Sequence, residues 1–136
     1  MQVTMNNPFP VSADKLWETI GGFNALPDWH PGVESSTLED GGKIRRLTLV
    51  GGGEIVEKLE KMDEAEHSYT YSIVSSPFPI ANYSATISIK DDGNSGSEVT
   101  WSGNFEPSSG SETDATKIIE DIYKTGFANL KKMFGM

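Results

Sequence analysis

The chain contains no cysteine and only two histidines among its 136 residues. Without thiols it forms no disulfide, offers no thiolate nucleophile, and holds neither an iron–sulfur cluster nor a cysteine-ligated zinc ion. The histidines, His30 and His67, lie far apart in the sequence, and the acidic run around His67 is typical of an exposed turn. No glycine-rich phosphate loop and no Gly-x-Ser-x-Gly motif is present. We therefore expect no metal and no cofactor.

Basic residues and long apolar runs are also scarce. Eleven Lys and Arg stand against twenty Asp and Glu, which gives a net charge of −9. Such a chain repels phosphate backbones and anionic lipid surfaces, so neither nucleic acid nor a membrane is an expected partner. No segment approaches the ~18 apolar residues of a membrane span, and the first residues lack the basic and apolar parts of a signal peptide. The sequence predicts a cytoplasmic protein, as a monomer or a weak homodimer.

What the sequence does contain is enough apolar surface for one core. Hydrophobic residues make up 36% of the chain. A chain of this length fits one domain of roughly 100 to 200 residues, and we expect a single domain over 1–136. From 33 to 106, short runs of alternating polarity are separated by glycine-rich turns, which indicates an antiparallel meander. The expected strands are 33–38, 43–50, 54–62, 68–74, 80–90 and 97–105, with a seventh at the N-terminus that ends near the first proline.

Helical patterns flank the predicted sheet. Ser12 is an expected N-cap for a short helix that ends at Gly21, a further turn is expected over 23–26, and two prolines predict irregular structure over 27–32. After Ser111, apolar residues recur at a spacing of three and four for about six turns. A single sheet must curl around this long C-terminal helix to bury both apolar faces. The prediction is an α+β fold with a cavity between sheet and helix.

The period of two in a strand predicts which side chains share the inner face. Arg45 and Leu47 fall on one face of their strand, and Glu57 falls on one face of the next. A turn centred on Gly52 would place Leu47 opposite Glu57, with Arg45 diagonal to Glu57 and within reach. An Arg45–Glu57 ion pair is therefore expected. The alternative is a carboxylate in a dry pocket whose raised pKa suits it to abstract a proton next to a carbonyl.

Buried tyrosine hydroxyls need partners, and polar groups that point into apolar space are typical of a small-molecule pocket. Amphipathic aromatic residues of an ordinary sheet explain the same pattern. The residues expected to bind a ligand are Trp29, Arg45, Leu47, Leu49, Ile55, Glu57, Leu59, Tyr69, Tyr71, Ile73, Phe78, Tyr83, Ala85, Trp101, Ile119, Tyr123 and Phe127.

Two side chains are candidates for acid–base catalysis, Glu57 and His30. His30 stands between prolines beside Asp28, which could orient its imidazole, and a histidine titrates near neutral pH. The competing interpretation is a surface turn in which Trp29 fills the core. Gly126 in the long helix admits either a ligand or Trp101. The segments 51–53 and 77–79 are either mobile lips of a cavity or plain hairpin connections.

A set of motifs spread over nearly the whole chain carries a resemblance. They are Pro10-Val11-Ser12-Ala13-Asp14-Lys15-Leu16-Trp17, Leu26-Pro27-Asp28-Trp29-His30-Pro31, Arg46-Leu47 followed by Gly51 and Glu57-Lys58-Leu59, Tyr71-Ser72-Ile73, Pro79-Ile80-Ala81-Asn82-Tyr83, and Trp101 with Phe105. No single motif is specific to one family. The order in which all of them occur is specific. In this order the chain resembles the SRPBCC (START-like, helix-grip) superfamily and, within it, the bacterial polyketide cyclase/dehydrase-like proteins.

The resemblance implies a helix-grip (START/Bet v-like) fold, in which a curved sheet of about seven strands wraps a long C-terminal helix and two short helices follow the first strand. It also implies an internal cavity for a small hydrophobic or amphipathic, lipid- or polyketide-like ligand. Members of the superfamily differ in function, so the fold does not assign a reaction. The first hypothesis is a ligand-binding protein. The alternative is a cofactor-independent cyclase or dehydrase that acts on a carbonyl substrate in the same cavity.

Overall fold

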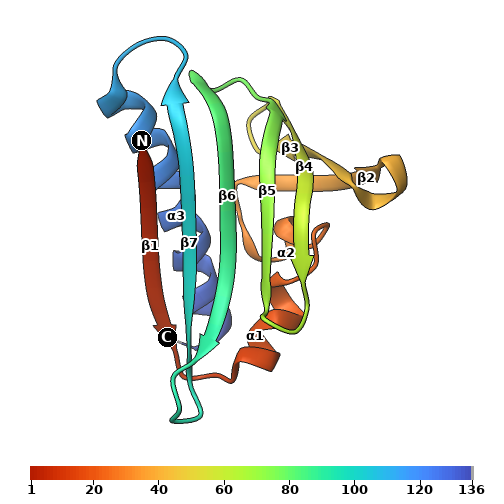
Figure 1. Ribbon diagram of the computed structural model, residues 1–136, viewed down its shortest axis with the longest axis vertical. Helices are drawn as coiled ribbons and strands as arrows, with labels where there is room; N and C mark the ends of the chain where they lie inside the picture. The colour runs from red at the N-terminus through yellow and green to blue at the C-terminus, as the bar shows by residue number, and fades with distance from the viewer. Residues whose placement is uncertain (136) are drawn as a thin grey trace.

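The computed structural model describes residues 1–135 as a seven-stranded antiparallel sheet that curves around one long helix (Figure 1). The elements are β1 (Gln2–Phe9), α1 (Ala13–Ile20), α2 (Leu26–Trp29), β2 (Val33–Glu39), the short 3-10 turn η1 (Asp40–Gly42), β3 (Ile44–Leu49), β4 (Glu54–Asp63), β5 (Ser68–Ser75), β6 (Ile80–Asp91), β7 (Ser97–Pro107) and α3 (Glu112–Met133). The predicted α+β helix-grip architecture is confirmed.

The strands follow the order β1-β7-β6-β5-β4-β3-β2, so six of them form a meander and β1 closes onto the last. The expected break of the first strand at its proline is wrong, because β1 continues through Pro8 to Phe9. β1 lies at the edge of the sheet, where the missing N–H of proline is tolerated. This arrangement leaves β1 and β2 as the two edge strands.

The two short helices cover one end of the concave face. The Ser12 side chain accepts a hydrogen bond from the Lys15 backbone N–H (3.3 Å) and so caps α1 as expected. The prediction of irregular structure over 27–32 is wrong at its start, because Pro27 lies in the first turn of α2. A proline there removes only an N–H that has no partner within the helix.

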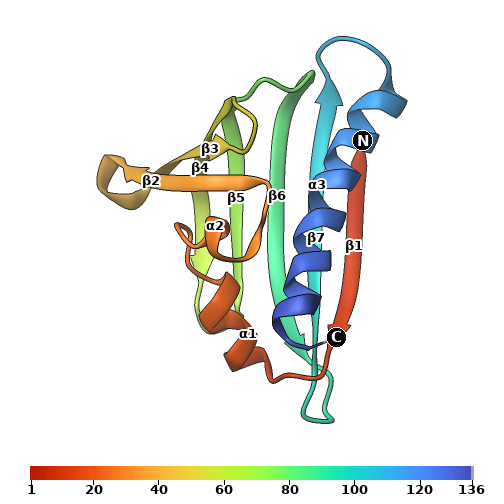
Figure 2. The same ribbon diagram turned by 180° about the vertical axis from the view of Figure 1, so that it is seen from behind.

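The long helix α3 lies across the concave face and packs chiefly against β1 and β7, as Figure 2 shows from behind. Its N-terminus is capped by Ser111, whose hydroxyl accepts from the Asp114 N–H (3.1 Å). The buried side of α3 is made by Ala115, Ile119, Tyr123, Gly126, Phe127 and Leu130. Within residues 1–135, no helix is long and apolar enough to cross a bilayer.

Gly126 lies where three aromatic rings pack closely against the backbone of α3. A Cβ atom there would lie 2.8 Å from Cδ2 of His30, 3.0 Å from Cζ3 of Trp29 and 3.1 Å from Cζ3 of Trp101. Of the two expected roles for this glycine, the structure therefore shows the one that admits Trp101, and it adds two further rings. Trp29 fills the core, as the competing interpretation of its segment had it, but the segment is not a surface turn, because His30 is buried as well.

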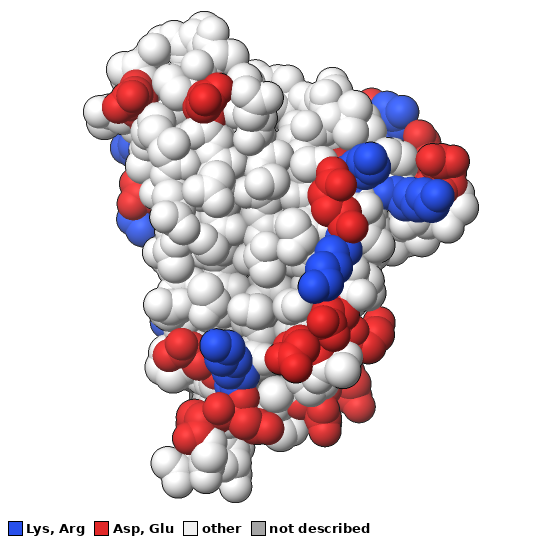
Figure 3. Space-filling view, in the orientation of Figure 1, with Lys and Arg blue, Asp and Glu red and all other residues white. Residues whose placement is uncertain are grey.

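The convex face of the sheet is polar but carries few charges at its centre. Figure 3 shows acidic and basic side chains gathered toward β4, β3 and the lower end, with an uncharged area between them. Cross-strand hydrogen bonds between short polar side chains lie on this face, such as Thr4 to Ser102 (2.8 Å) and Thr70 to Thr86 (2.8 Å). The apolar side chains of the strands therefore lie on the concave face, where the helices cover them.

Candidate functional site

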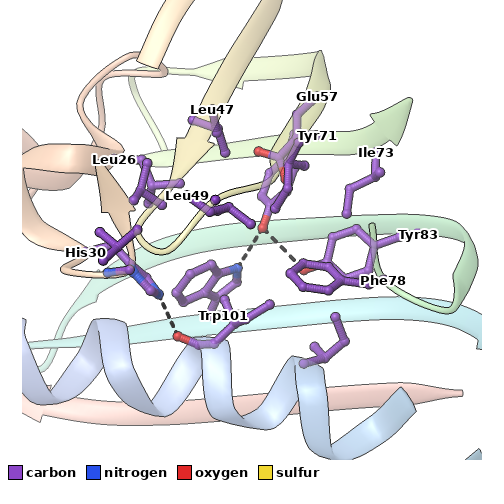
Figure 4. Close-up of a pocket in the computed structure, with 17 residues that line it drawn as sticks. Leu26, His30, Leu47, Leu49, Glu57, Tyr71, Ile73, Phe78, Tyr83 and Trp101 are labelled. Atoms are coloured by element: carbon purple, nitrogen blue, oxygen red, sulfur yellow. Dashed lines mark hydrogen bonds between the residues drawn. The ribbon is translucent and has the colours of Figure 1, made fainter. Parts of the chain in front are cut away.

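An internal cavity of about 200 Å³ lies between the concave face of the sheet, α2 and α3. Its lining is mostly aliphatic and aromatic, and Figure 4 shows the few polar groups that face it: Glu57, Tyr71, Tyr83 and Trp101 from neighbouring strands of the sheet, and His30 beside the helix. An apolar pocket with a small number of placed polar groups is typical of small-molecule sites. The cavity is therefore the candidate functional site.

Most of the expected site residues line this cavity. They are His30, Leu47, Leu49, Ile55, Glu57, Tyr71, Ile73, Phe78, Tyr83, Trp101 and Ile119. Both segments named as lips contribute as well, through Gly52 in one and Phe78 in the other. Val50 and Gly52 are exposed to solvent and also line the cavity, so the cavity approaches the surface at this turn.

Seven expected residues lie outside the lining: Trp29, Arg45, Leu59, Tyr69, Ala85, Tyr123 and Phe127. Tyr69 packs against Phe23 and against Trp17 of α1. It therefore faces the short helix α1 instead of α3, the helix that its position in the strand predicts. Alternation along a strand correctly places Arg45, Leu59, Tyr69 and Ala85 on the inner face, and the other three residues lie on the helices α2 and α3. Alternation does not tell which part of that face the helices cover.

Five lining residues had not been expected there: Leu26, Gly32, Val33, Val50 and Ile122. Gly32 and Val50 lie in turns, where neither the helical nor the strand period applies, and Leu26 and Val33 are the first residues of α2 and β2. Ile122 is half-buried on α3 and belongs to the apolar stripe of that helix. The stripe was the one sequence signal that could have found it.

A buried ion pair forms one wall of the site. The predicted Arg45–Glu57 pair is confirmed, with Nε and Nη2 of Arg45 each 2.7 Å from the same oxygen, Oε1 of Glu57. The expected register is wrong by two residues, because Arg45 lies directly opposite Glu57 and Leu47 opposite Ile55. The turn is centred on Gly51, and moving a hairpin centre by one residue moves the pairing by two.

Arg45 is held from every side. Nη1 donates to the Phe23 carbonyl oxygen (2.7 Å), and the guanidinium lies 4.3 Å from the centre of the Phe23 ring and 4.9 Å from that of Tyr71. Burial, the largest single influence, would lower the pKa of Arg45, but the charge of Glu57 together with Tyr69 and Tyr71 outweighs it, and the pKa lies above its ordinary value. Arg45 therefore stays protonated inside the protein.

Glu57 uses only half of its carboxylate on this pair. Oε1 accepts the hydrogen bond from Nε of Arg45 and lies 2.7 Å from Nη2 in the ion pair, and Oε2 accepts no hydrogen bond from any described residue. Burial raises the pKa of the Glu57 carboxyl, and the charge and hydrogen bonds of Arg45 partly offset that rise. Glu57 lines the cavity, so its second oxygen is a candidate acceptor for a ligand there.

His30 joins the segment after α2 to the long helix. Since a carbonyl only accepts and an amide N–H only donates, Nε2–H of His30 donates to the Ile122 carbonyl (2.8 Å), and Nδ1 accepts from the Gly32 N–H (3.0 Å). The imidazole is thus neutral, and the lone pair on Nδ1 accepts the hydrogen bond from Gly32. This geometry leaves His30 no lone pair with which to take a proton from a ligand.

Comparisons with known proteins place the chain in a family. A family model described as polyketide cyclase/dehydrase and lipid transport matches residues 1–135. The chain belongs to this family. The resemblance to SRPBCC proteins is thereby confirmed, and family and fold together support a protein that binds a hydrophobic ligand.

Solved structures agree with this assignment. XoxI from Bacillus cereus is 40% identical, with 98% of this chain and 94% of that chain covered and a TM-score of 0.95. An uncharacterised protein from Bacillus thuringiensis is 39% identical over 98% of each chain, also with a TM-score of 0.95. A START superfamily protein from Mycobacterium smegmatis shares the fold at 14% identity, with 98% of this chain and 96% of that chain covered and a TM-score of 0.81. No curated protein matches.

Replacing Arg45 by methionine should leave the Glu57 carboxylate buried without its partner. We expect the free energy of unfolding to fall by about 3 to 5 kcal/mol in chemical denaturation. The neighbouring Arg46 is the matched control, because its pairs with Glu39 and Glu54 lie on the outer surface, where its side chain is 40% exposed. Arg46→Met should change stability little. Equal losses in the two variants would contradict a special role for the buried pair.

Burial lowers the pKa of His30 below its ordinary value of 6.5, against the opposing effect of its backbone hydrogen bonds. The unfolded chain therefore binds the proton first as the pH falls, so the free energy of unfolding should decrease below about pH 6.5, by up to about 1.4 kcal/mol per unit. His30→Gln should show a shallower decrease between pH 7 and 5. An NMR titration of the His30 ring with a midpoint at or above 6.5 would refute this account without any variant.

Proposed function

We propose that this protein binds a compact, mainly apolar molecule in the cavity and holds a hydrogen-bond donor of that molecule at Oε2 of Glu57. The observation that carries the proposal is the geometry of the ion pair, in which Arg45 contacts one carboxylate oxygen of Glu57 and leaves the other without a protein partner. In an apolar cavity, a carboxylate oxygen that no protein donor contacts favours a ligand that donates a hydrogen bond to it. A ligand hydroxyl or amino group supplies such a donor.

The size of the cavity limits the ligand. An apolar cavity of roughly 150 Å³ accommodates benzene, and this one measures about 200 Å³. One ring with short substituents fits that volume, whereas a long acyl chain or a multi-ring polyketide requires the turn at Val50 and Gly52 to move. Of the hydrophobic and amphipathic ligands considered, the structure favours small single-ring compounds.

The test compares 4-ethylphenol, which carries a donor, with ethylbenzene, which carries none, by NMR titration. In Glu57→Gln, Arg45 can only donate, so the new amide oxygen should take the place of Oε1 and its NH2 group the place of Oε2. The cavity then offers a donor instead of an acceptor. We expect the preference for 4-ethylphenol over ethylbenzene to fall by about tenfold or more, since a hydrogen bond to a charged group contributes roughly 1.5 to 3 kcal/mol.

Glu54→Gln is the control for this experiment, because Glu54 begins the same strand but lies at the surface. It should keep the wild-type preference. If Glu57→Gln does not fold, the hydroxyl proton of 4-ethylphenol bound to the wild type serves instead, since a bond to a carboxylate moves its resonance strongly downfield. Binding of neither probe, or equal preference in all three proteins, would reject the proposal.

The alternative function, a cofactor-independent cyclase or dehydrase, draws on the same oxygen. A carboxylate with a raised pKa and one oxygen that no described residue contacts, in an apolar cavity, is suited to take a proton from the carbon next to a carbonyl. His30 is not suited to this role, because its lone pair is engaged.

Exchange of acetophenone methyl protons in D2O tests this second function. A proton would pass from the methyl carbon to Oε2 of Glu57 and a deuteron would return, so the protein should catalyse deuterium incorporation measurable by NMR. Glu57→Gln should abolish the exchange and retain the fold. Exchange no faster than in buffer would leave binding alone as the function.

A further inference from the structure

Three tyrosines and one tryptophan form a buried hydrogen-bonded chain beside the cavity. Nε1–H of Trp101 donates to the Tyr71 hydroxyl (3.0 Å), the Tyr71 and Tyr83 hydroxyls lie 3.3 Å apart, and those of Tyr83 and Tyr123 lie 2.5 Å apart. All four residues are at most 4% exposed. Figure 4 shows the part of this chain that reaches the cavity, with Tyr71 between Trp101 and Tyr83.

The number of hydrogen atoms exceeds the number of bonds in this chain. One indole N–H and three hydroxyl hydrogens serve only three contacts, so one hydrogen has no acceptor within the chain. Since the indole only donates and Tyr83 has a single hydrogen, the spare hydrogen belongs to Tyr71, Tyr83 or Tyr123. The direction of the two phenol–phenol bonds decides which.

Tyr123 is the unfavourable place for it. Its side chain is fully buried, its hydroxyl is packed against Gly103, and it accepts or donates no other bond among the described residues. A spare hydroxyl hydrogen there would be a buried donor without an acceptor, at a cost of about 1 to 3 kcal/mol. Tyr71 and Tyr83 both line the cavity, where a ligand can supply an acceptor.

We infer that the chain directs its spare hydroxyl hydrogen into the cavity from Tyr71 or Tyr83 and binds an acceptor oxygen of the ligand there. Each hydroxyl in such a chain polarises the next, which strengthens the terminal donor. A carbonyl or ether oxygen, or the oxygen of a hydroxyl group, fits this position.

Together with Glu57, the chain defines the chemical class of the ligand, an inference that rests on the proposed function. Tyr71 lies opposite Leu59 and Glu57 lies opposite Ile73 on neighbouring strands, so Tyr71 and Glu57 are diagonal neighbours on the inner face. No hydrogen bond joins them within residues 1–135, so both remain available to a ligand. The cavity therefore fits a single-ring molecule with an acceptor oxygen and a donor group, such as a hydroxylated aryl ketone.

The test uses acetophenone, whose carbonyl only accepts, with ethylbenzene as the apolar reference. In the wild type, the carbonyl stretch of 13C-labelled acetophenone bound in the cavity should lie below its frequency in hexane, as a donated hydrogen bond requires. In the double variant Tyr71→Phe with Tyr83→Phe, that shift should disappear. The affinity for acetophenone relative to ethylbenzene should fall about tenfold, and this ratio corrects for changes in cavity volume.

Tyr123→Phe is the matched control, because it removes the phenol that does not line the cavity. It should keep both the shifted stretch and the affinity ratio of the wild type. An unshifted stretch in the wild type, or a ratio that the double variant leaves unchanged, would overturn the inference. If 4-ethylphenol still binds in a manner that depends on Glu57, only this inference fails; if no probe binds, the proposed function fails with it.

Discussion

The sheet buries only one of its faces, and the structure follows from that constraint. Apolar side chains of the strands point to the concave side, where α3, α1 and α2 must cover them. α3 packs chiefly against β1 and β7, and the short helices cover the lower end. The helices do not fill all of the space over the concave face, and the cavity of about 200 Å³ forms between the sheet, α2 and α3.

The polar groups in and around this space form hydrogen bonds mainly with one another. One acceptor and one donor hydrogen remain without a partner. Arg45 occupies one oxygen of Glu57 and leaves the second oxygen as an acceptor. The hydroxyl chain that begins at Trp101 has one hydrogen more than it has acceptors. An unmatched acceptor and an unmatched donor in an otherwise apolar cavity describe a ligand with both groups, which is a narrower class than hydrophobic molecules in general.

Local patterns predicted much of this architecture because strands and helices have fixed periods. The expected strands agree with the observed ones within two residues, and the cap at Ser111 is present as expected. The pairing of β3 with β4 was missed by two residues because three consecutive glycines do not show which one is the centre of the turn. The helical turn at Pro27 was missed because a proline in a first turn looks the same in sequence as a proline that breaks a helix.

The sequence by itself determined the class of fold, the inward face of each strand and the pairing of Arg45 with Glu57, since these depend on periodicity and on the cost of an unpaired buried charge. Only the tertiary structure decided which inward residues reach the cavity. It placed Tyr123 behind the cavity lining and Ile122 in the lining. It also engaged both ring nitrogens of His30 in hydrogen bonds, with the Ile122 carbonyl and the Gly32 N–H. These outcomes depend on how far α3 and the turns cover the sheet, and that distance is set by packing between segments remote in sequence.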